Sequence, residues 1–209
     1  MTERFTRNDN FSYTCNRCTL CCYAYTVRVN PYEIARLANY LGKSTSEVIA
    51  QHTQSEGIEL RREKNGACNF LQADGCSVHP DRPLACRLYP LGRHTNEKSE
   101  ETFSQLTLQK GSKGEFSGEV RTVGEFLEGQ GAEPYIRMAD RYNALVSKIV
   151  ANGALEGASE YEPEIVLDVD LALAKSGSSG LESGLDPEAK SLRHIEILKT
   201  RLGLDGAES

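Results

Sequence analysis

The stretch that decides the fold is "CNRCTLCC", residues 15–22, which holds four of the seven cysteines of the chain. Cys15, Cys18 and Cys21 form two overlapping C-x-x-C pairs, and Cys22 follows Cys21 directly. This spacing lets a loop curl its thiolates and backbone amides around one centre, as in zinc and iron–sulfur sites. The crowding therefore indicates a loop that folds around a metal.

The other three cysteines lie in "GACNFLQADGCSVHPDRPLACRLYP", residues 66–90. The segment "QADG" predicts a hairpin turn that brings Cys68 and Cys76 to one edge. Cys86 lies between Pro83 and Pro90, which leave room for a helix of about two turns. No cysteine follows Cys86. The two cysteine groups are thus expected to complete one site or to form two.

Two other interpretations of the cysteines carry less weight. An odd number of cysteines and a vicinal pair both oppose a framework of disulfides. Buried inert cysteines need apolar neighbours, whereas Asn, Arg and Thr surround the first cluster. That interpretation stays open for any one of Cys22, Cys68 or Cys76. Metal ligation by the thiolates is therefore the prediction.

The run Cys15, Cys18, Cys21 reproduces the C-x2-C-x2-C pattern that supplies three ligands to a [4Fe–4S] cluster. A regular helix would instead place Cys22 on the face of Cys15 and Cys18, and turn Cys21 away. A straight helix also separates its first and last thiol by about 10 Å, too far for one zinc ion. The predicted ligands are Cys15, Cys18, Cys21 and Cys86. Cys22, Cys68 and Cys76 are alternates or a second site, and zinc is the alternative to the iron–sulfur cluster.

Two arginines and a histidine lie near the later cysteines. Cations beside thiolates lower their pKa and offset the negative charge of a thiolate–metal centre. Arg82 and Arg87 are therefore predicted to bind the cofactor, with ordinary salt bridges as the alternative. His79 stands at C-x2-H from Cys76 and is expected in a turn beside the site. His52, His94 and His194 lack ligand-like neighbours and are expected at the surface.

Composition limits the partners. The chain has 209 residues and a formal net charge of −6, which disfavours nucleic acid and an anionic membrane surface. No apolar run approaches the length of a membrane span, and the start "MTERFTRNDNFSY" has no signal-peptide core. We therefore expect a cytoplasmic protein without a membrane span, whose partner is an unknown protein or small molecule.

The pattern of elements predicts an α+β fold: a small metal-stapled core of short strands and a hairpin, packed helices and a C-terminal helical tail. Capping boxes and apolar periodicity predict helices over 30–42, 44–52, 122–130 and 132–150. Short strands are expected over 58–63, 66–71, 76–79 and 101–108, and 164–174 fits a strand or a helix. The domain prediction is 1–150 for a cysteine-cluster metal-binding domain and 151–209 for an extension. That extension contains a flexible linker (176–185) and a tail helix that starts at Asp186 and buries Leu192, Ile195, Leu198 and Leu202.

At "CNRCTLCC" and "CNFLQADGCSVHPDRPLACRLYP" the sequence resembles the YkgJ-like cysteine-cluster family, whose signature is CxxCxxCC and whose members are described as zinc- or iron-chelating. "NPYEIARLANYLG" and "TVGEFLEGQGAEPYIRMADRY" also resemble the family. The resemblance implies that all seven cysteines are metal-ligand candidates and that "RPxxCRxYP", with Tyr89, is part of the cluster wall. Many members carry a further cysteine where this chain has Gln109 and Lys110.

The resemblance leaves two functions open, and whether the chain is an enzyme stays undecided. Some proteins with this cluster are similar to flagellin lysine-N-methylases, so redox or methylase-like activity is one hypothesis. "GSKGEFSG" lacks the G-x-G-x-x-G spacing of a nucleotide loop, and no catalytic triad can be named. The other hypothesis is a structural zinc module, or a metal carrier or sensor.

Overall fold

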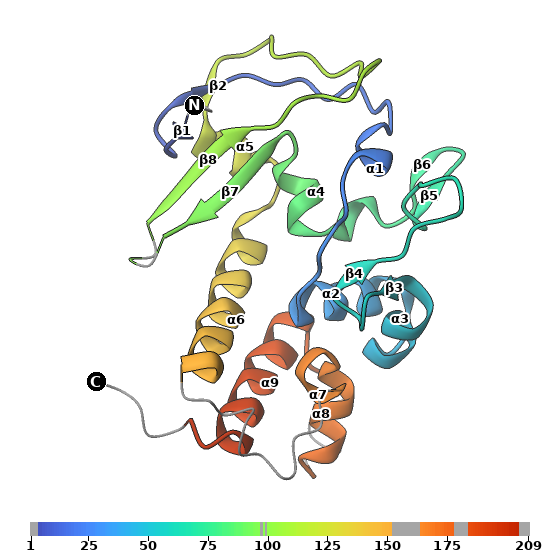
Figure 1. The fold of residues 1–209 in the computed structure, drawn as a ribbon, viewed down its shortest axis with the longest axis vertical. Coiled ribbons are helices and arrows are strands. Elements are labelled where there is room, and N and C mark those ends of the chain that lie inside the picture. The colour runs from blue at the N-terminus through green and yellow to red at the C-terminus, as the bar shows by residue number, and fades with distance from the viewer. Residues whose placement is uncertain (1–3, 97, 99, 152–163, 178–183, 205–209) are drawn as a thin grey trace. The chain divides into compact units, whose positions relative to one another are not determined.

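The computed structural model describes residues 4–96, 98, 100–151, 164–177 and 184–204 (Figure 1). The chain divides into two compact units, Met1–Val27 with Arg61–Pro134 and Arg28–Leu60 with Tyr135–Ser209. The predicted α+β class is confirmed, because helices occur together with several small antiparallel sheets. Most of the predicted linker, residues 178–183, lies outside the described residues.

The first unit contains all seven cysteines and most of the strands. A three-stranded antiparallel sheet has the order β1 (Arg4–Phe5), β8 (Glu101–Gln105), β7 (Leu91–Thr95). β2 (Asn10–Phe11) pairs with β9 (Arg121–Thr122). The predicted hairpin is present, with Leu71 of β5 (Leu71–Gln72) opposite Cys76 of β6 (Gly75–Cys76). The helices of the first unit are α1 (Cys21–Ala24), the 3₁₀ helix η1 (His79–Asp81), α4 (Leu84–Leu88) and α5 (Val123–Gly129).

Aromatic packing forms the core of this unit beside the sheet. Phe11 meets Phe126 edge-to-face with ring centroids 5.0 Å apart, and both rings are buried. Phe103 of β8 is fully buried. α5 begins where the sequence predicts, because Thr122 and Glu125 form the capping box. The N-terminal segment is therefore held between β8 and α5, which brings the first cysteine cluster to a fixed place.

The second unit is mostly helical. α2 (Pro31–Leu41) and α3 (Thr45–His52) both start at their predicted capping boxes, and Gly42 ends α2 in the left-handed conformation with φ 64°. The other elements are β3 (Thr53–Gln54), β4 (Glu59–Leu60), α6 (Glu133–Ala151, in this unit from Tyr135), α7 (Glu164–Leu167), α8 (Val169–Lys175) and α9 (Pro187–Arg201). Segment 164–174 is thus two short helices.

α2, α8 and α9 share one apolar cluster made of Ala35, Val169, Leu173 and Ile197. The tail helix α9 begins at its predicted cap, Asp186, and buries Ile195 and Leu198 as expected. The expected burial of Leu192 is wrong, since 37% of that residue is exposed. Helical spacing placed Leu192 on the apolar face, but Ser191 and His194 take the buried positions on that turn.

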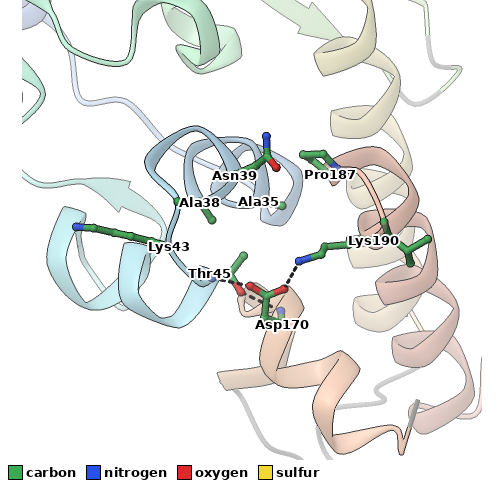
Figure 2. Close-up of a pocket in the computed structure, with 10 residues that line it drawn as sticks. Ala35, Ala38, Asn39, Lys43, Thr45, Asp170, Pro187 and Lys190 are labelled. Carbon is green, nitrogen blue, oxygen red and sulfur yellow. Dashed lines mark hydrogen bonds and ion pairs between the residues drawn. The ribbon is translucent and has the colours of Figure 1, made fainter. Parts of the chain in front are cut away.

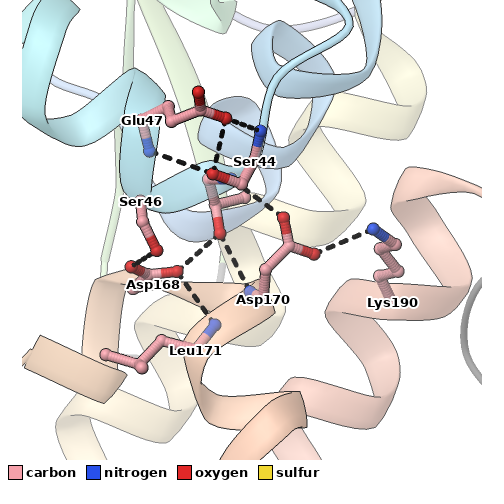
Figure 3. Close-up of polar contacts among 8 residues, drawn as sticks. Ser44, Ser46, Glu47, Asp168, Asp170, Leu171 and Lys190 are labelled. Atoms are coloured by element: carbon pink, nitrogen blue, oxygen red, sulfur yellow. Dashed lines mark hydrogen bonds and ion pairs between the residues drawn. The ribbon is translucent and has the colours of Figure 1, made fainter. Parts of the chain in front are cut away.

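A polar network ties α3 to α8 inside this unit (Figure 3). The buried carboxylate of Asp168 accepts hydrogen bonds from the hydroxyls of Thr45 (2.6 Å) and Ser46 (2.5 Å) and from the Leu171 N–H. Asp170 accepts from the Thr45 N–H at 2.9 Å and pairs with Lys190 at 2.8 Å. Asp168 thus has three donors in the buried position, which offsets the loss of its hydration.

A small pocket of about 190 Å³ lies beside this network (Figure 2). The second half of α2, the starts of α3 and α9, and α8 line it, and its polar residues are Asn39, Lys43, Thr45, Asp170 and Lys190. The Asp170–Lys190 ion pair lies across its wall. The polar groups of the pocket therefore serve the packing of these helices.

His194 is fully buried on α9, so its predicted surface position is wrong. Its Nε2 lies 2.7 Å from the Ile165 carbonyl, and its Nδ1 lies 3.0 Å from the Tyr142 hydroxyl. Nε2–H donates to the carbonyl, and Nδ1 accepts from the hydroxyl, so the neutral ring meets both partners. Burial lowers the pKa of His194 to about 4.

This network predicts that acid destabilises the second unit. The unfolded chain binds a proton at a histidine pKa near 6.5 and the folded chain only near 4, so stability falls as the pH drops between these values. We expect His194 to cost about 2 to 3 kcal/mol between pH 7 and pH 4.5. Urea unfolding at both pH values measures the loss.

His194→Gln removes the titrating ring, so its stability should fall less over the same pH range than that of the unchanged chain. The exposed His94 gives the control, and His94→Gln should keep most of the pH dependence. If the stability of His194→Gln fell as much between pH 7 and pH 4.5 as that of the unchanged chain, this role of the buried ring would be contradicted.

Candidate metal centre

The first cysteine cluster is a loop that leads into one helical turn. Arg17 and Thr19 have φ angles of 49° and 61°, so the backbone between Cys15 and Cys21 is not a regular helix. α1 then starts at Cys21 and places Cys21 and Cys22 on consecutive helical positions. The straight-helix geometry is therefore excluded, and the segment curls as the C-x-x-C spacing predicts.

Hydrogen bonds of Arg62 connect this turn to the second cysteine segment. Its guanidinium donates to the carbonyls of Cys22 and Tyr23, at 3.4 and 3.3 Å, and also to those of Tyr25 and Gly66. The Cys68 N–H donates to the Cys22 carbonyl at 2.9 Å. Positions far apart in sequence thus become direct backbone neighbours. Sequence reasoning missed Arg62, because nothing in "IELRRE" marks which arginine turns inward.

A hydrogen bond between the vicinal thiols Cys21 and Cys22 shifts their pKa values in opposite directions. The bond from the Cys22 thiol lowers the pKa of Cys21 to about 7, with help from the positive charge of Arg82. The same bond, burial and the nearby thiols Cys76 and Cys86 raise the pKa of Cys22. Cys21 is therefore the member of the pair that carries the negative charge.

Burial raises the pKa of both Cys68 and Cys76, and the two thiols also interact electrostatically with Cys21. Arg62 opposes the rise at Cys68, and Arg82 opposes it at Cys76. Together with the interactions of Cys22, and of Cys18 with Cys21, these effects connect six thiols pair by pair: Cys18, Cys21, Cys22, Cys68, Cys76 and Cys86.

Cys15 and Cys18 lie toward an aromatic side of the site. Burial raises the pKa of Tyr13, and the charges of Cys15, Cys18 and Cys21 raise it further. Tyr89 packs between Tyr13 and Tyr25, with ring centroids 6.3 and 5.8 Å away. Tyr13 and its neighbour Tyr89 therefore lie on the side of the site where Cys15 and Cys18 are.

The thiols interact electrostatically, but their side chains in the described residues do not form a metal-binding arrangement. Within the described residues, which include all seven cysteines, no group of three or more His, Cys, Asp or Glu side chains is arranged to hold a metal ion. Cys15 and Cys21 are exposed, and the other five are partly buried. The donor set itself, thiols with cationic neighbours, fits zinc or iron.

The two predicted arginines have different surroundings. Arg82 donates to the His79 carbonyl and the Gln130 side chain, both at 2.8 Å, while its charge lowers the pKa of Cys21. Arg87 is buried and donates to the backbone carbonyls of Arg82, Gln130 and Pro80. Of these two arginines, Arg82 is the one whose charge acts on thiols, whereas Arg87 holds the backbone of the turn that contains Arg82.

A glycine-rich segment, which we call the cover loop (residues 107–118), lies along the first cluster (Figure 1). Thr14 and Glu115 exchange backbone hydrogen bonds of 2.9 and 3.1 Å. The Asn16 side chain donates to the Lys113 carbonyl at 2.6 Å, and the Lys113 N–H donates to the Cys18 sulfur at 3.5 Å. The sequence signal, glycines and small polar residues, predicts a loop but not its docking.

The hydrogen bonds at Cys18 shift its pKa. Partial burial raises the pKa of Cys18, but the N–H groups of Lys113 and Leu20 and the Ser112 hydroxyl outweigh burial, so the net shift is downward. Cys18 therefore loses its proton more readily than an ordinary cysteine thiol.

Comparison with known proteins finds a family model that matches the cysteine segments. Residues 14–106 match the family model CxxCxxCC, described as a putative zinc- or iron-chelating domain. The match covers less than half of the chain. The resemblance seen in the sequence is thereby confirmed for the CxxCxxCC domain, and metal chelation is its described property.

No curated protein and no solved structure matches the chain. Among the described helices, none is long and apolar enough to cross a membrane. The cover loop from residue 107 onward lies just beyond the matched segment, although it contacts Cys18 inside it.

The docked cover loop predicts a sharp effect at Gly114. A Cβ atom there would lie 2.2 Å from the Tyr13 hydroxyl, and Tyr13 is buried. We expect Gly114→Ala to lower the free energy of unfolding of the first unit by about 1 to 3 kcal/mol, because the ring or the loop must move. Urea unfolding of metal-free protein measures it.

Gly184→Ala is the control, since a Cβ atom at Gly184 meets nothing within 4 Å. It should change the free energy of unfolding by less than about 0.5 kcal/mol. If Gly114→Ala were equally neutral, the cover loop would not be packed on Tyr13.

Proposed function

We propose that the CxxCxxCC domain holds an iron–sulfur cluster of the [4Fe–4S] type. The observation that carries the proposal is the set of six electrostatically connected thiols, which come from the C-x2-C-x2-C segment and from the later cysteine segment. That loop pattern supplies three ligands to such clusters, and a remote cysteine completes them. The proposed ligands are Cys15, Cys18, Cys21 and Cys86, with Cys22, Cys68 and Cys76 as alternates or a second site.

Charge balance supports a thiolate-bound centre. Four thiolates around such a core leave about two net negative charges, which need cations or hydrogen-bond donors nearby. The charge of Arg82 helps to lower the pKa of Cys21, Arg62 opposes the rise in the pKa of Cys68, and two N–H groups donate to Cys18. These groups would stabilise the sulfurs in their charged form and hold their orientation.

The chain's own residues limit what such a centre can do. A bound iron–sulfur cluster supplies one-electron chemistry. Tyr13, Tyr25 and Tyr89 would shield one side of it, and the exposed positions of Cys15 and Cys21 leave another side open to a partner. We therefore infer a redox or structural role in which the protein fixes the thiols and controls their charge.

Zinc is the second candidate, because the family description names zinc and because four thiolates also suit this ion. His79 contacts Arg82, and burial together with the charge of Arg82 lowers the pKa of His79, which favours its neutral form. A zinc centre would act as a structural staple of the first unit.

Anaerobic purification followed by metal and acid-labile sulfide analysis separates these candidates. The cluster predicts iron with a matching amount of sulfide. Zinc without sulfide would overturn the cluster and leave the staple. Protein that takes up neither metal under reducing conditions would overturn metal binding altogether.

Cys18→Ser is the sharpest variant for this proposal. Its thiol already accepts two N–H hydrogen bonds, so its loss should remove more than half of the bound metal. Because metal binding contributes to folding, melting should fall by at least about 5 °C. Unchanged metal content and melting would contradict a ligand role for Cys18.

Cys22→Ser tests the vicinal pair separately. The raised pKa of Cys22 reflects its hydrogen bond to Cys21 rather than a contact with a cation. Full metal loading in Cys22→Ser would identify Cys22 as a spare thiol, whereas loss equal to that of Cys18→Ser would identify it as a ligand.

A further inference from the structure

Ser112 of the cover loop lies beside the first cysteine cluster, outside both cysteine segments. Its hydroxyl is 3.8 Å from the Cys18 sulfur, and the neighbouring Lys113 N–H is 3.5 Å from the same atom. A sulfur accepts hydrogen bonds at such distances, and a thiolate accepts them more strongly than a thiol.

The direction of the Ser112 hydroxyl follows from its other contact. The Gly114 N–H donates to Ser112 Oγ at 3.2 Å, which occupies a lone pair of that oxygen. The hydroxyl hydrogen is then available for the Cys18 sulfur, the other polar atom that Ser112 Oγ contacts. Ser112 therefore acts as a donor to Cys18 when that sulfur is charged.

Several contacts hold the cover loop so that these donors stay in place. The Tyr25 hydroxyl donates to the Thr107 carbonyl at 2.8 Å, and Asn16 donates to the Lys113 carbonyl at 2.6 Å. The Ser112 N–H donates to the Gln109 carbonyl at 2.8 Å, which closes a tight turn. Contacts with Tyr25 and with Asn16 of the cysteine loop thus hold the two donors in place.

We propose that Ser112 is a positioning residue of the metal centre, and that its hydroxyl and the Lys113 N–H together orient and stabilise the Cys18 thiolate. This proposal rests on the metal-binding function proposed above. Outer hydrogen bonds to metal ligands typically change metal affinity by 10- to 100-fold, because they fix the ligand and adjust its charge.

The test compares anaerobically purified wild-type protein with Ser112→Ala, Ser112→Thr and Ser117→Ala. Ser117 lies on the same loop, but its hydroxyl donates to Glu115 at 3.2 Å, so it is the matched control. Two quantities are measured: the rate at which excess chelator removes the bound metal, and the sulfur-to-metal charge-transfer absorption. A zinc-loaded protein is first exchanged with Co²⁺ for the absorption measurement.

Ser112→Ala should lose metal about tenfold faster and shift the charge-transfer band to longer wavelength, because the sulfur regains electron density. Ser112→Thr keeps the hydroxyl and should restore both values, and Ser117→Ala should match the wild type. A Ser112→Ala protein with wild-type release and spectrum would overturn this inference alone.

A Ser112→Ala protein with faster release but an unchanged band would also overturn it, since loosening of the loop would then explain the loss. Wild-type protein that binds no metal would overturn the proposed function and this inference together. The outcomes therefore distinguish failure of the positioning role from failure of metal binding.

Discussion

Repulsion between crowded sulfurs is the constraint on which the first unit depends. The hydrogen bond to Cys21 and burial raise the pKa of Cys22, and the charges of Cys21, Cys76 and Cys86 raise it further. Thiolates at such distances repel unless cations, N–H donors or a metal offset their charge. Arg62, Arg82 and the cover loop supply part of that compensation. A metal would supply the remainder and would make its own binding part of the stability of the fold.

The second unit has its own sources of stability. It buries an apolar cluster between α2, α8 and α9, and the Asp168 network ties α3 to α8. The neutral ring of His194 completes a buried contact between α6, α7 and α9. Loss of metal should therefore affect the first unit far more than these contacts.

The sequence allowed the fold to be predicted where signals are local. The capping boxes at Asn30, Ser44 and Thr122 predict three helix starts, and all three are confirmed. β7 was not predicted, because "LGRHT" has neither alternation nor apolar content, and its pairing with β8 is a non-local contact. His194 was misplaced because burial of one histidine depends on partners on two other helices.

At the candidate site, too, local sequence signals allow prediction, whereas contacts between distant segments do not. Cysteine spacing identifies the thiols, since that spacing is itself the chemical signal. Arg62, Ser112 and Lys113 carry no such signal, because their roles arise only when distant segments meet at Cys22 and Cys18. The predicted roles of Arg82, Arg87 and Tyr89 toward a bound cofactor remain predictions.

X-ray absorption at the edge of the bound metal tests the central claim, closure of the thiols around one inorganic centre, most directly. The account predicts a first shell made of sulfur, at about 2.3 Å for zinc or iron. An iron–sulfur cluster adds iron neighbours in the second shell. A first shell of nitrogen and oxygen atoms would contradict the account, because the metal would then be bound elsewhere than at the cysteines.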